Sequence, residues 1–146
     1  MRKNIIIVIA IIVILGAIIV VPRLLGTDNR EVKFKTVDEE DLPSKIVEAL
    51  PNYIMEERAL TFQYEEDVYV IVTRGEKSSE GYKVELDSIK TESYGEDFDL
   101  VVYAKFTDPS PNEILSQEYD YPKIVVKTNL KDLPKSIHLD VEYINE

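Results

Sequence analysis

The chain contains no cysteine among its 146 residues and only one histidine, His138. The lack of cysteine excludes disulfide bonds, thiol nucleophiles, cysteine metal sites and a lipid-modified cysteine. A single histidine leaves few ligands for a zinc site. Phosphate-binding glycine loops and the G-x-S-x-G serine motif are also missing. We therefore expect a protein that is not an enzyme and that holds no cofactor or metal.

Basic residues are scarce after Gly26, where 14 lysines and arginines face 28 acidic residues and give a net charge of −14. Nucleic-acid binding needs a basic surface, so this class of function is excluded. The negative charge favours solubility or a basic partner.

The amino terminus is strongly apolar, with 17 consecutive apolar residues from Ile5 to Val21. As a helix this run would span about 26 Å, close to the thickness of a hydrocarbon core. A cleaved signal peptide usually has a shorter apolar region and an A-x-A site, which is absent here. We predict an uncleaved membrane anchor over residues 1–26. Arg2 and Lys3 favour a cytoplasmic amino terminus, with the rest of the chain extracytoplasmic.

Residues 27–41 are predicted to form a linker with an edge strand near Glu31–Val37. The acidic run Asp38–Asp41 suggests calcium, but the EF-hand pattern and its glycine are absent. A helix start is the better interpretation, with Asp41 as the cap and Pro43 in the first turn.

The predicted helix carries one apolar stripe, formed by Ile46, Val47, Leu50 and Ile54. Pro51 interrupts this helix, because proline removes a hydrogen bond and clashes with the preceding turn. We expect either a kink or two short helices that meet near Leu50.

The region from Val68 to Ile89 is the most strongly patterned part of the chain. Val68–Thr73 is almost continuously apolar, which is typical of a central strand covered on both faces. Tyr82–Asp87 alternates apolar and polar residues, which indicates a strand with one exposed face. Because Gly75–Gly81 between them is polar and turn-forming, the pattern predicts a β-hairpin with a long loop, whose glycines can adopt positive φ.

The sequence GEKSSEGY at residues 75–82, followed by an alternating strand, resembles the G-E-K-P-T-G-G-Y hairpin of the protease complex subunit PrcB C-terminal family. The residues that fit this pattern are Gly75, Glu76, Lys77, Gly81 and Tyr82. Three residues depart from it: Ser78 replaces Pro, Ser79 replaces Thr and Glu80 replaces Gly. The loop should therefore be more acidic and less rigid.

A second part of the resemblance lies downstream, where Pro109–Pro111 is followed by Tyr121, Pro122 and the apolar strand Ile124–Val126. The similarity covers residues 68–130 and its motifs are non-catalytic. It implies a surface-held binding module associated with an extracytoplasmic protease.

The rest of the chain supplies further strands. Those expected are Leu60–Tyr64, Asp97–Thr107, Ile124–Thr128 and Ile137–Tyr143. Asp108–Tyr119 should be a long loop, with a turn of helix at Asn112–Ser116 as one option. The predicted fold class is mainly β (α+β): an antiparallel β-sandwich or partly open barrel over residues 42–146, with one short kinked helix.

Candidate functional residues are few. His138 lies in IHLDVEY beside Asp140 and could form a His-Asp pair, but an exposed strand face explains it better. Phe98, Phe106 and Tyr82 are expected to face the core, whereas Tyr103, Tyr119 and Tyr121 suit either the core or a protein contact.

We expect a membrane-anchored, extracytoplasmic protein-binding module, an accessory or stabilising subunit of an exported protease. A protease inhibitor that presents a hairpin loop, and a structural cell-envelope domain, remain alternatives. The predicted partner-binding residues are Gly75, Glu76, Lys77, Ser79, Glu80, Gly81, Tyr82, Tyr121 and Pro122. Tyr82 as a core residue of a plain turn is the competing interpretation.

Overall fold

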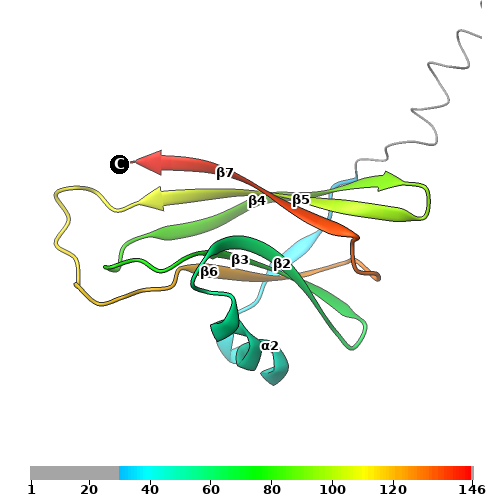
Figure 1. Ribbon diagram of the computed structural model, residues 1–146, viewed down its shortest axis with the longest axis horizontal. Helices are drawn as coiled ribbons and strands as arrows, with labels where there is room; N and C mark the ends of the chain where they lie inside the picture. The colour runs from blue at the N-terminus through cyan, green and yellow to red at the C-terminus, as the bar shows by residue number, and fades with distance from the viewer. Residues whose placement is uncertain (1–29, 146) are drawn as a thin grey trace, which may run out of the picture.

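The computed structural model describes residues 30–145, which form two β-sheets with short helical segments on one side (Figure 1). The mainly β prediction is confirmed, and the sheets do not close into a barrel. The predicted anchor, residues 1–26, lies outside the described residues. Within residues 30–145 no helix combines the length and the apolar character needed to cross a membrane.

One sheet has four antiparallel strands and the other has three. The four-stranded sheet has the order β1 (Phe34–Thr36), β6 (Lys123–Thr128), β3 (Asp67–Arg74) and β2 (Glu57–Tyr64). The three-stranded sheet has the order β4 (Lys83–Tyr94), β5 (Asp97–Asp108) and β7 (Ser136–Asn145). The predicted edge strand near Glu31–Val37 is therefore confirmed as β1.

The strand β3 is central and buried on both faces, as its continuous apolar sequence predicted. Val70 and Val72 face the core between the two sheets, where they meet Leu100 and Phe106 of β5. Ile71, on the opposite face of β3, packs with the residues under the helix. The four-stranded sheet is thus the middle layer, between the three-stranded sheet and the helical segments (Figure 1).

Three short helical segments cover the outer face of the four-stranded sheet. They are the 3-10 helix η1 (Glu39–Asp41), the α-helix α2 (Ser44–Ala49) and the 3-10 helix η2 (Leu50–Asn52). Of the two outcomes expected from Pro51, a kink or two short helices, the structure shows two short helices that meet at Leu50. The predicted Asp41 cap is wrong, because α2 begins at Ser44 after Pro43 and has no side-chain cap. Val47 was also wrongly placed on the buried stripe, since only Ile46 and Leu50 are fully buried.

The predicted hairpin between Val68–Thr73 and Tyr82–Asp87 is wrong. Both edges of β3 are occupied, by β2 in a hairpin with a turn at Glu65 and Glu66 and by β6. The chain after β3 therefore crosses to the other sheet, where β4 pairs with β5. Residues 75–82 are a connection between sheets.

The predicted all-antiparallel arrangement is corrected by β7, which runs parallel to β5. After β5 the chain crosses from the three-stranded sheet to the four-stranded sheet and runs back along β6. It then returns to the three-stranded sheet as β7. These two crossings reverse the chain direction twice, so β7 must run in the direction of β5. Residues Asn112–Ser116, in the first crossing, form no helix.

The strand β4 keeps one face on the core along its whole length because it contains an irregularity between Leu86 and Ser88. Val84 and Leu86 pack against the core before it, and Ile89 is buried after it. An extra residue in one strand shifts the alternation by one position. Because of this bulge, the even-numbered residues Val84 and Leu86 and the odd-numbered residue Ile89 face the same core.

Candidate functional site

Two connections far apart in the sequence meet at one end of the sandwich. Lys77 and Asp120 exchange backbone hydrogen bonds, each 2.9 Å from nitrogen to oxygen. The Glu80 amide also donates to the Ser116 carbonyl, at 3.3 Å. We call residues 75–82 and 109–122 together the loop end. They form one surface instead of two independent loops.

Both glycines of residues 75–82 have positive φ, +92° at Gly75 and +101° at Gly81. At Gly81 an added Cβ would lie 2.8 Å from Leu115 Cδ2 and 3.0 Å from Pro109 Cβ. At Gly75 it would lie 3.3 Å from the Met55 carbonyl oxygen. Glycine therefore suits the backbone conformation at both positions. It also allows close packing, between the two connections at Gly81 and against residues 55–57 at Gly75.

Arg74, the last residue of β3, lies where the loop end joins the strands. Its side chain is 5% exposed, pairs with Asp108 and donates to the Thr107 carbonyl at 2.8 Å. The guanidinium carbon lies 4.9 Å from the centre of the Tyr82 ring and 5.3 Å from that of Phe106. Tyr82 is half-buried, with Lys77 Nζ 5.2 Å from its ring centre. Tyr82 thus holds Arg74 and Lys77 together and is neither a core residue nor a free anchor.

Tyr121 and Glu76 connect the two parts of the loop end through their side chains. The Tyr121 hydroxyl donates to Glu76 Oε2 at 3.0 Å, and this hydrogen bond raises the pKa of Tyr121 above its ordinary value. Pro122 and Ser79 are buried, and the Pro122 carbonyl accepts from the Arg74 amide. Of the predicted site residues, Glu76 and Glu80 remain exposed. Pro122 and Ser79 shape the surface from within.

The residues 68–129 match the family model described as PrcB C-terminal. This stretch belongs to the PrcB C-terminal family. It includes β3, β4, β5, β6 and both connections of the loop end. The family resemblance found in the sequence is thus confirmed for these residues, and it points to a subunit associated with a protease complex. No curated protein and no solved structure matches the chain.

Several apolar residues are exposed at this end of the PrcB C-terminal segment and beside it; of these, sequence reasoning named only Tyr119, as suited to the core or to a protein contact, and missed the others. Ile114 is 100% exposed and Tyr119 is 68% exposed. Met55 lies beside residues 75–82, since its carbonyl accepts from the Glu76 amide, and is also exposed. Tyr143 of β7 is exposed as well and donates to Glu57 Oε1 at 2.5 Å, which raises the pKa of Tyr143. No sequence signal separates Ile114 from its half-buried neighbour Leu115.

His138 is exposed, as expected, and lies on β7 outside the PrcB C-terminal segment. Its Nε2 is 3.3 Å from Ser136 Oγ and 4.0 Å from Asp99 Oδ2. A catalytic triad needs the serine and the carboxylate on different ring nitrogens, whereas here both face Nε2. The Ser136 hydroxyl instead donates to Asp99 and holds the pKa of this carboxyl below its ordinary value. The contacts therefore stabilise the junction of β5 and β7.

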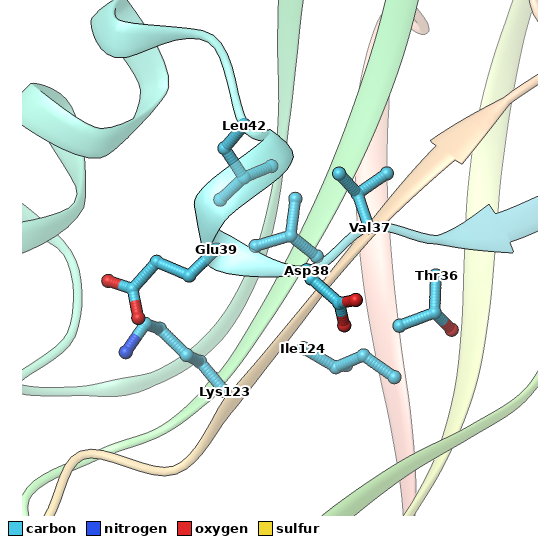
Figure 2. A pocket seen from close by; sticks show the side chains of 8 residues that line it. Thr36, Val37, Asp38, Glu39, Leu42, Lys123 and Ile124 are labelled. Carbon is cyan, nitrogen blue, oxygen red and sulfur yellow. The ribbon is translucent and has the colours of Figure 1, made fainter.

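A shallow cavity of about 240 Å³ lies beside the start of β6, between it and the segment that leads to η1. Figure 2 shows its mixed lining, with the carboxylates of Asp38 and Glu39 and the amine of Lys123 among apolar side chains. None of the predicted site residues lines it. Within residues 30–145 no cluster of three or more histidine or acidic residues could hold a metal ion.

Proposed function

We propose that this protein is a non-enzymatic, membrane-anchored accessory subunit that binds and stabilises an exported protease through its loop end. The observation that carries the proposal is the pairing of Lys77 with Asp120 inside the family-matched segment. This pairing joins two polar connections into one surface on a rigid sandwich. Rigid scaffolds commonly present their binding residues on such connections.

The placement of residue 30 supports this proposal. The Arg30 carbonyl accepts from the Thr91 amide at 2.8 Å, near the end of β4 that is remote from the loop end. From Lys83 to Thr91 the strand spans about 26 Å at 3.3 Å per residue. If residues 1–26 cross the membrane, the loop end faces away from the membrane, where a partner has access to it.

Co-purification of the full chain from solubilised membranes of its own cells tests the proposal. The expected result is recovery of an exported protease in stoichiometric amount. Cells that lack the chain should then show a shorter protease lifetime. Recovery of no protease, together with an unchanged protease lifetime, would leave a structural cell-envelope domain as the better account.

The inhibitor alternative makes a different prediction. A free hairpin loop would enter an active site, but residues 76–81 are tied to residues 116–120 by backbone hydrogen bonds. We therefore expect that titrating the full chain, in detergent, against papain-like and subtilisin-like proteases leaves their activity unchanged. Dose-dependent inhibition would favour the inhibitor instead.

The membrane anchor is tested separately by fractionation. We expect the full-length chain in the membrane fraction, and protease added outside intact cells should degrade the region after Gly26. A mature chain that begins near Thr27 and is recovered from the medium would show a cleaved signal peptide.

A further inference from the structure

The exposed apolar side chains of this protein are concentrated at the loop end. Seven large apolar residues are exposed in the described part of the chain. Four of them, Met55, Ile114, Tyr119 and Tyr143, lie on or beside the loop end, and the other three are scattered over α2, the last residue of β4 and the segment before β7. Single exposed apolar residues are common, but a cluster at one end indicates a contact surface.

Ile114 is held outward by the packing of its neighbour. Leu115 is half-buried, with its Cδ2 2.8 Å from the position that a Cβ on Gly81 would take, and the Ser116 carbonyl accepts from the Glu80 amide. These contacts fix the backbone on one side of Ile114. The backbone hydrogen bonds between Asp120 and Lys77 fix the chain next to Tyr119. A backbone segment that is already ordered before binding loses less entropy when a partner covers its side chains.

The surface around these residues is acidic. Residues 75–82 and 109–122 contain five carboxylates and one lysine, a net charge of −4. Glu113 and Glu118 lie next to the exposed apolar pair and are themselves exposed. An apolar centre with a charged rim is the usual arrangement of a protein interface, and the rim selects a partner of opposite charge.

We propose that Ile114 and Tyr119 are the apolar anchors of the loop end and that they insert into an apolar pocket with a lysine- and arginine-rich rim on the partner protein. This inference rests on the proposed function for the class of partner. It adds the two anchor residues and the chemistry of the surface that receives them. A few central aromatic and aliphatic residues usually carry most of the binding energy of an interface.

Synthetic peptides provide a probe that does not depend on the identity of the protease. The probe peptides carry a central Leu-Phe-Trp cluster flanked by lysine and arginine, and the control peptides carry the same cluster flanked by glutamate. Binding to the full chain in neutral-lipid nanodiscs is measured by fluorescence anisotropy. The basic peptides should bind at least tenfold more tightly than the acidic ones, and added salt should reduce the difference.

The double variant I114S/Y119S should bind the basic peptides at least tenfold more weakly than the parent. The matched control is L133S, which removes an exposed apolar residue from the segment before β7 and should bind as the parent does. Unchanged thermal unfolding of both variants shows that folding is retained. Equal binding of basic and acidic peptides, or equal binding by the double variant and the parent, would contradict the proposal that Ile114 and Tyr119 are the anchors. This conclusion would hold even if a protease co-purifies. Failure to recover a protease while the peptide preference holds would instead count against the proposed function.

Discussion

Arg74 is the residue on which the geometry of the loop end depends most. Its buried guanidinium satisfies two carbonyls, those of Lys83 and Thr107, and pairs with Asp108. These three groups belong to β4 and β5, so a residue at the end of β3 ties one sheet to the other. Tyr82 packs on the same guanidinium, so the orientation of this ring follows from Arg74.

The variant R74M should lower the free energy of unfolding by about 2–3 kcal/mol, because methionine leaves two part-buried carbonyls and a carboxylate without their donor. Chemical unfolding of the full chain measures this change. The matched control is K77M, which removes the other cation that lies over the Tyr82 ring and should cost less than about 1 kcal/mol. Similar losses in the two variants would show that Arg74 has no special role.

The hydrogen bond from Tyr121 to Glu76 gives the loop end a pH dependence. Since the pKa of Tyr121 is raised in the folded protein, its stabilising contribution is fully present below the unfolded pKa of about 10. It is lost as the pH rises through the folded value. The variant E76Q should lower the pKa of Tyr121 toward 10, as measured by NMR titration of the labelled tyrosine ring. E80Q is the control, and an equal shift in E80Q would contradict the assigned partner.

At the scale of elements, the two connections of the loop end depend on each other. Gly81 allows Leu115 and Pro109 to approach the backbone, and Lys77 pairs with Asp120 between the same two connections. The GEKSSEGY motif is therefore explained by contacts with a segment about 35 residues downstream. A hairpin turn alone would not require this close packing.

G81A should lower the free energy of unfolding by about 2–3 kcal/mol, because alanine is strained at a φ of +101° and its Cβ collides with Leu115. Amide exchange at Asp120 should also become faster. G95A tests the effect of positive φ alone, since Gly95 has a φ of +62° and open space around it, and should cost about 1 kcal/mol. An unchanged exchange rate at Asp120 in G81A would show that the two connections are independent.

For the whole molecule, hydrophobic patterning predicted which faces are buried but not which strands are neighbours. The apolar run of β3 indicated burial on both faces because each successive side chain meets a different layer. The alternation at the start of β4 requires only one covered face, and either sheet can provide it. The predicted hairpin is wrong because β2 and β6 occupy both edges of β3, so β4 completes its covered face in the other sheet.

The candidate site was predictable only in part. The glycines and charges marked residues 75–82, and the prolines marked residues 109–122, so both segments were found from the sequence. Their backbone pairing depends on long-range packing, and so does the outward direction of Ile114. In the sequence NEILSQ, Ile114 and Leu115 are equivalent apolar neighbours, and only the tight space against Gly81 decides which of them is exposed.

The central claim is that the loop end is the surface that contacts a protein partner. Its most direct test is photo-crosslinking in the native cells, with benzoylphenylalanine placed at position 114 in one variant and at position 133 in another. We predict a crosslinked adduct with an exported protease from position 114 and none from position 133. An adduct of equal yield from position 133, or no adduct from position 114, would contradict this account.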